Sequence, residues 1–190
     1  MNKKKVMMVL FCIVLPLFLL LLTYNLVLFL TTLTSAQENV FLFLEGKGEL
    51  APEFTELEAS HLEDVKKVMA YTDYVFYVLL LAVTIIVTGH RKDKDFVLRL
   101  FGYGGKVTVA AIVLLGVLSM LFFDAVFSLF HTIFFPQGNW IFAADSLLIQ
   151  TFPIEFFFTI SSNTFLLTLC LGILFILSQH LYRYVLRHRN

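Results

Sequence analysis

The sequence predicts an all-α integral membrane protein with four transmembrane helices and an extracytoplasmic cap of short interfacial helices. Three observations lead to this fold class. Hydrophobic residues make up 59% of the 190 positions, charged residues only 15%, and Phe alone occupies 22 positions. A soluble domain carries about 25% charged residues, and its core cannot bury so many phenylalanines. The length allows one compact domain, so we interpret residues 1–190 as a single membrane domain.

Four apolar segments are long enough to span a bilayer, at about residues 6–30, 70–89, 107–128 and 164–184. A helix needs roughly 20 apolar residues to cross the hydrocarbon. Backbone groups in lipid must pair within their own segment, which makes helix the expected conformation.

The first segment has an alternative interpretation as a secretory signal peptide, because lysines precede it and Thr34-Ser35-Ala36 follows it. Its apolar run is far longer than the 7–15 residues of a signal h-region, so we interpret it as a retained anchor. Cys12 follows Phe11 rather than the small residue of a lipobox. No CxxC pair exists, which disfavours a disulfide oxidoreductase.

Basic residues concentrate on one side of the predicted bundle. Eleven of the 14 Lys and Arg lie at the N-terminus, in the loop 90–106 or at the C-terminus. By the positive-inside rule, both termini and this loop are cytoplasmic, and the segments 31–69 and 129–163 are extracytoplasmic. We therefore expect a multi-pass protein of the bacterial cell membrane with its site facing outside. Net charge is zero, and no basic face suggests nucleic-acid binding.

The first outer segment contains two elements. The run Val40-Phe41-Leu42-Phe43-Leu44, followed by Glu45-Gly46-Lys47-Gly48, is compatible with a short β-hairpin. Beyond Pro52, the spacing of Thr55 and Glu58 fits a capping box and predicts a helix through His61. The second outer segment is too apolar for a solvated loop and too interrupted for a span, which favours short helices in the membrane interface.

His61 and His131 are the two histidines predicted outside, one in each outer segment. Imidazole titrates near neutrality and can act as base, acid or proton shuttle. The alternative is that they are two unrelated interfacial residues. His90, His180 and His188 fall near inner span ends, where a cationic residue simply suits the interface.

Other polar residues near these histidines are candidate supporting groups. Asp64 can orient His61 from one turn away, or be one more acid on an acidic helix. Asp145 stands alone in an apolar stretch, which predicts a buried partner. Asn139 and Trp140 follow Gly138 and can donate hydrogen bonds, although Trp140 also fits a plain interface anchor.

Several sequence motifs of known chemistry are absent. The chain contains no HExxH zinc motif, no Gly-x-Ser-x-Gly elbow and no Walker loop. No spacing favours a His–His–Asp metal site. We therefore expect neither a cofactor nor a metal, and an enzyme built on this sequence would rely on histidine chemistry.

Two blocks of sequence resemble the lipoprotein intramolecular transacylase family, Lit, whose members are small bacterial membrane proteins with four predicted spans. The blocks are His61-Leu62-Glu63-Asp64-Val65-Lys66 and Phe130-His131-Thr132-Ile133-Phe134-Phe135 with Gly138-Asn139-Trp140, Asp145 and Phe152-Pro153. By architecture the resemblance covers nearly the whole chain. Relative to that family, residues 31–53 look trimmed.

The resemblance implies an acyltransferase that moves the sn-2 acyl chain of a lipoprotein's diacylglyceryl cysteine onto the cysteine α-amine. It implies His61 and His131 as the catalytic base and acid, in an order left open, with His61 preferred as base. Lys66, the Asn139 amide or backbone N–H groups would stabilise the oxyanion. The expected partners are a diacylated lipoprotein and membrane lipid, with the protein acting as a monomer.

Two other functions remain as alternatives to the enzyme. A non-enzymatic accessory subunit or envelope-stress sensor would use the outer segments to bind a partner, and both histidines would be replaceable. A transporter or channel would place ionisable groups along the bilayer midplane, whereas here they gather at one face.

Overall fold

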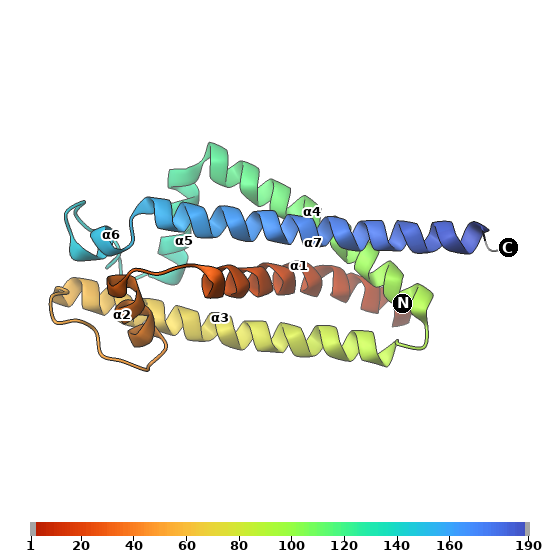
Figure 1. Ribbon diagram of the computed structural model, residues 1–190, viewed down its shortest axis with the longest axis horizontal. Helices are drawn as coiled ribbons and strands as arrows, with labels where there is room; N and C mark the ends of the chain where they lie inside the picture. Colours follow the sequence, from red (N-terminus) through yellow and green to blue (C-terminus); the bar gives the residue numbers. More distant parts are fainter. Residues whose placement is uncertain (1–2, 189–190) are drawn as a thin grey trace.

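The structure is a computed structural model that describes residues 3–188, within which it contains seven helices and no strand (Figure 1). The helices are α1 (Lys3–Leu30), α2 (Ser35–Leu44), α3 (Glu56–Gly89), α4 (Lys94–Leu121), α5 (Phe123–Phe134), α6 (Leu147–Thr151) and α7 (Ile154–His188). Four of them, α1, α3, α4 and α7, are long and apolar enough to cross a membrane. The all-α membrane fold class is therefore confirmed.

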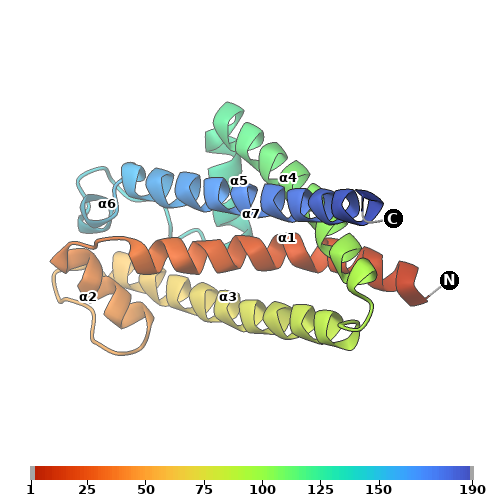
Figure 2. The same ribbon diagram turned by 45° about the vertical axis from the view of Figure 1, so that its right-hand side comes forward.

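The long helices form a bundle with two different ends. α1, α3 and α7 run side by side, while α4 is inclined and its far end diverges from them (Figures 1 and 2). The start of α1, the α3–α4 connection and the end of α7 share one end of the bundle. At the other end, α2 and α6 form a head, and α5 turns back from the end of α4.

Several elements differ in extent from the sequence expectation. The outer helix through His61 and the second span are one continuous helix, α3. Most of the expected loop 90–106 is helical, because α4 already begins at Lys94, where the Asp93 carboxylate caps the Phe96 N–H at 3.0 Å. The apolar run after residue 107 breaks at Phe122, so its C-terminal part forms the separate helix α5.

The β-hairpin considered for residues 40–48 is wrong, because Ser35–Leu44 forms the helix α2. Thr34 and Gln37 make a reciprocal capping box at its start. Val40, Phe43 and Leu44 are buried at the i, i+3, i+4 spacing of one helix face. They share a core with Leu62, Leu148 and Phe152. The local pattern of this run fits either a strand or a helix, and packing against the neighbouring helices therefore determines that it is helical.

Small and hydroxyl-bearing residues bring α1, α4 and α7 close together. A Cβ on Gly105 would lie 2.7 Å from the Gly172 carbonyl oxygen, so α4 and α7 are almost in backbone contact there. Thr23 of α1 and Thr168 of α7 share a buried hydrogen bond of 2.6 Å. In a membrane, lipid tails are as apolar as the helix surfaces, so the hydrophobic effect does not drive helices together. Helices associate instead through close packing of small residues and through interhelical hydrogen bonds.

A buried carboxylate joins the head to the bundle. Glu58, 1% exposed, accepts the Thr55 N–H and hydroxyl with Oε2, each at 2.8 Å, which confirms the capping box. Its Oε1 accepts the Leu148 N–H of α6 at 2.8 Å. Burial raises the pKa of Glu58, but the hydrogen bonds from Leu148 and Thr55 outweigh this and hold it below the ordinary value.

We expect Gly105→Ala to destabilise the α4–α7 contact by roughly 1–3 kcal/mol, because the added methyl meets a backbone carbonyl that cannot move aside. Gly116→Ala in the same helix is the matched control, since a Cβ there meets nothing within 4 Å. Thermal unfolding in detergent should show a lower midpoint for the first variant only. Equal midpoints would contradict the close packing.

We expect Glu58→Ala to destabilise the head by about 1–3 kcal/mol for each buried N–H that loses its acceptor. Glu56→Ala, which removes an exposed carboxylate from the same turn, is the control. Because the folded-state pKa of Glu58 is lowered, its contribution is present above the ordinary value of 4.5 and is lost as the pH falls through the folded pKa. The unfolding midpoint of Glu58→Ala should lie below that of Glu56→Ala at neutral pH, and the two midpoints should converge at acid pH. A difference that does not change with pH would contradict the expectation.

Candidate functional site

The candidate site lies where the first turns of α3 meet the segment that follows α5. These turns carry charged residues and precede the apolar part of α3, so we place them outside the hydrocarbon. His61 follows Glu58 by one turn and is 8% exposed. Its ring lies 4.7 Å from that of Phe135 and 5.5 Å from that of Phe142, measured between centroids. His61 therefore occupies an aromatic pocket.

His131 reaches the same place from α5. Its Nδ1 lies 2.8 Å from the Phe127 carbonyl oxygen, which can only accept, so Nδ1 carries the hydrogen and Nε2 has a free lone pair. Its ring lies 4.0 Å from Phe127 and 4.8 Å from Trp140. It also lies 5.6 Å from Phe135, the ring that contacts His61. The two histidines predicted to meet are thus brought to the same phenylalanine.

A polar turn beside His61 is anchored to α3 through Asp64. Gly138 has a φ of +76°, which favours glycine, and the turn places Gln137 and Asn139 over the Asp64 carboxylate. Both amide groups donate to Asp64 Oδ2, Asn139 at 2.9 Å. Asn139 Nδ2 also lies 3.3 Å from Ser60 Oγ. This network fixes the segment between His131 and Phe142 on α3.

The electrostatics of the site favour neutral histidines. Burial lowers the pKa of His61 most, and the proximity of His131 lowers it further, whereas Asn139 and Asp64 act in the opposite direction. Burial also lowers the pKa of His131, against the hydrogen bond to Phe127. Lys67, 2.9 Å from Asp64 Oδ1, and the two amides keep the pKa of Asp64 low. At neutral pH the site therefore holds two uncharged imidazoles beside an ionised carboxylate.

Two of the other sequence candidates lie elsewhere. Lys66 places its ammonium 4.4 Å from the ring centroid of Phe43 on α2, a cation–π contact that holds α2 on α3. Asp145 is exposed before α6 and offers only its backbone carbonyl, to Gln150, so the buried partner expected for it is not found. The reason is that the apolar stretch around Asp145 is a surface turn.

Sequence reasoning missed four members of the site, namely Gln137, Phe135, Phe142 and Ser60. Their residue types are common at membrane interfaces, and only the turn at Gly138 could have suggested that its neighbours fold back on α3. Within residues 3–188, no three His, Cys, Asp or Glu side chains gather as metal ligands would.

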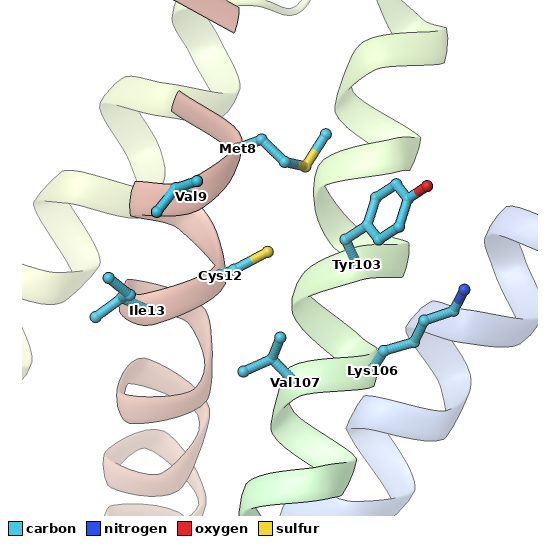
Figure 3. A pocket seen from close by; sticks show the side chains of 7 residues that line it. All are labelled: Met8, Val9, Cys12, Ile13, Tyr103, Lys106 and Val107. Carbon is cyan, nitrogen blue, oxygen red and sulfur yellow. The ribbon is translucent and has the colours of Figure 1, made fainter. Parts of the chain in front are cut away.

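A hollow of about 450 Å³ lies between α1 and α4, near the end of the bundle where the termini lie. Figure 3 shows Met8 and Cys12 of α1 facing Tyr103 and Val107 of α4 across it. Its lining is almost entirely apolar, and no site histidine takes part. The hollow is therefore separate from the candidate site.

Known proteins resemble this chain in sequence. The family model for lipoprotein intramolecular transacylase, Lit, matches residues 30–157, which is more than half of the chain. An uncharacterized protein of Aquifex aeolicus (strain VF5) is 29% identical over 124 residues, covering 64% of this chain and 54% of that protein. The match thus spans about half the length of this relative.

Solved structures share the fold. An in meso structure of the membrane-integral Lit from Bacillus cereus matches with a TM-score of 0.79 and 18% identity, covering 99% of this chain and 98% of that one. A second, with a histidine-to-arginine mutation, matches with a TM-score of 0.77 and 19% identity over 99% and 94% of the two chains. With four apolar helices and this fold, the chain is a multi-pass membrane protein. Because its family model covers the head, both histidines and the turn at Gly138, the chain belongs to the lipoprotein intramolecular transacylase family, Lit.

Proposed function

We propose that this protein is an intramolecular acyltransferase that moves the sn-2 acyl chain of a lipoprotein's diacylglyceryl cysteine to the cysteine α-amine. The product is a lyso-form lipoprotein with an N-acyl group and a monoacylglyceryl thioether. One observation carries the proposal beyond family membership. His61 and His131, from separate outer segments, contact the same ring of Phe135, and at His131 the free nitrogen is Nε2.

The reaction needs a base and an acid, and the two imidazoles suit both roles. The α-ammonium, with an ordinary pKa near 8, must lose a proton before it attacks the ester carbonyl. The C–N bond forms, the C–O bond to the glycerol breaks, and the amine gives up a second proton. One of the two protons goes to the glyceryl oxygen and the other to water, so atoms and charge balance. We assign the first transfer to His61, which passes its proton to water. The unprotonated Nε2 of His131 then takes the second proton from the amine and delivers it to the glyceryl oxygen.

The neutral state of the histidines supports this assignment. Each imidazole first accepts a proton from the amine and so must be unprotonated when substrate arrives, and burial lowers the pKa of both His61 and His131. Because amine and ester belong to one molecule, the protein has to orient them rather than bring two reactants together. Effective molarity then supplies a large share of the rate.

The tetrahedral oxyanion needs a hydrogen-bond donor, and two of the expected donors are already engaged. The Asn139 amide donates to Asp64 and Ser60, and the Lys66 ammonium lies over Phe43. This leaves the indole N–H of Trp140, beside His131, as the candidate side-chain donor.

The lipid part of the substrate fits the surroundings of His131. α5 has no buried residue, and its apolar side chains, such as Phe130 and Ile133, are exposed. With 12 residues it is too short to span the bilayer, so we place it at the interface. A diacylglyceryl group has its ester carbonyls at this depth, between the headgroup region and the acyl chains.

We expect His61→Gln and His131→Gln each to reduce lyso-lipoprotein formation by about 10²–10⁴-fold, since each removes a proton-transfer group. The readout is mass spectrometry of a reporter lipoprotein's N-terminal peptide, in cells that otherwise make only diacylated lipoproteins. His180→Gln, an exposed histidine near the other end of α7, is the matched control and should leave the product unchanged. If both site variants form normal product, the two-histidine mechanism is wrong. If the wild type itself forms no lyso-lipoprotein, an accessory or sensor function replaces the enzyme.

We also propose that both termini are cytoplasmic and that the histidines face outside, because the basic residues gather at the end of the bundle that carries the termini. Alkaline phosphatase, which is active only outside the cytoplasm, should be inactive when fused after residue 188. Inserted between Gly46 and Glu49, in the exposed connection after α2, it should be active. The reverse pattern would overturn this orientation.

A further inference from the structure

The orientation of the Asn139 amide is determined by its neighbours. The Asp64 carboxylate can only accept hydrogen bonds, so the group that faces it at 2.9 Å must be the Nδ2 amino group. The same nitrogen lies 3.3 Å from Ser60 Oγ. A flipped amide would set its oxygen against a carboxylate, which is repulsive. Asn139 Oδ1 therefore points away from Asp64.

Two buried polar atoms remain without a hydrogen-bond partner at this place. They are Nδ1 of His61 and Oδ1 of Asn139, both shielded from solvent, with no partner among residues 3–188. Leaving such an atom unpaired costs about 1–3 kcal/mol. The side chains are close, because Asn139 contacts Ser60 and Asp64, which flank His61 on α3. One atom is an acceptor, and the other can be a donor.

We infer that Asn139 is a positioning residue for His61: its Oδ1 accepts the Nδ1–H, which fixes the tautomer and leaves Nε2 as the reacting nitrogen. Asp64 then helps to position His61 through the amide that it orients, and not by a direct hydrogen bond. The catalytic consequence rests on the proposed function, but the tautomer does not. His131 has the same arrangement with a backbone carbonyl as acceptor, so both imidazoles present Nε2 to the substrate.

The turn that carries Asn139 supports this role. Gly138 adopts its φ of +76° immediately before Asn139. Gln137 also donates to Asp64, but within residues 3–188 no hydrogen bond joins it to His61, and it is not among the groups that act on the His61 pKa. The chain therefore offers two amides on one carboxylate: Asn139 has a buried oxygen without a partner, whereas Gln137 is an exposed residue. Gln137 is the matched control.

The direct test is ¹⁵N NMR of histidine-labelled protein in detergent micelles without substrate, because ¹⁵N shifts distinguish protonated from unprotonated ring nitrogens. The His61 signals are assigned by their loss in His61→Gln. In the wild type and in Gln137→Ala, Nδ1 of neutral His61 should be protonated. In Asn139→Leu this tautomer should no longer dominate. A wild-type His61 protonated at Nε2, or an unchanged tautomer in Asn139→Leu, would overturn the inference.

A charge swap tests the relay while keeping its atoms. Asn139→Asp alone sets two carboxylates together, which disrupts the turn. Adding Asp64→Asn restores one amide and one carboxylate, with Asp at 139 accepting from His61. We expect the single variant to lose about 10–100-fold of activity, as when outer partners of metal-bound histidines are removed, and the double variant to recover most of it. A double variant as impaired as the single one would count against the relay.

The pH dependence separates positioning from simple docking of the turn. His131 on α5 and Asp64 on α3 are the titratable groups that act on His61. Asp64→Asn keeps an acceptor for Asn139 but removes a charge that raises the His61 pKa. We expect the Nδ1–H tautomer to persist and the acidic limb of kcat/KM to move to lower pH. If the acidic limb of kcat/KM does not move in Asp64→Asn, the coupling between Asp64 and His61 is contradicted. Inactive wild type with the Nδ1–H tautomer intact would contradict the proposed function and leave the inference standing.

Discussion

The buried carboxylate of Glu58 is the interaction on which the arrangement of the head depends. It accepts hydrogen bonds from the N–H and hydroxyl of Thr55 at the start of α3 and from the Leu148 N–H at the start of α6. The two N–H groups would otherwise be unpaired. One turn later on the same helix comes His61, so the position of the histidine relative to α6 is set by this single side chain. A buried charge is tolerable only when donors surround it, and here those donors come from two segments 90 residues apart.

The position of His131 depends on a second feature, the end of the membrane-spanning helix α4 within a longer apolar run. The break at Phe122 turns α5 away from the direction of α4 and brings His131 back toward α3. A continuous helix would carry that histidine away from the head. The turn at Gly138 then returns the chain to Asp64. Two local irregularities, in a sequence that otherwise favours regular helix, thus create a place where two imidazoles share an aromatic neighbour.

Local hydrogen bonding explains which parts of this fold could be predicted from sequence. The capping box at Thr55 and Glu58 needs only residues three apart, and the apolar spans need only their own length. The run from Val40 to Leu44 could not be assigned, because a short apolar stretch fits either period until its packing partners are known. Nothing near Lys66 in sequence indicates Phe43 as its neighbour, and nothing near Asp145 shows that its turn is exposed. For Asn139, the residue type indicated a donor to the substrate. In the structure its amino group already donates to Asp64, and its oxygen is the atom without a partner.

The lack of any buried side chain on α5 bears on how the proposed substrate, a lipoprotein with two fatty chains, could arrive. Transfer of acyl chains from bilayer to water costs about 0.8 kcal/mol per methylene group, more than 10 kcal/mol for one chain of ordinary length. A route through solvent is therefore closed to such a molecule. Since most apolar side chains of α5 are exposed, and we place this helix at the membrane interface, a lipid-anchored peptide can diffuse laterally until its glycerol is level with His131. Its tails would stay immersed throughout, and only the polar cysteine end would need to enter the head.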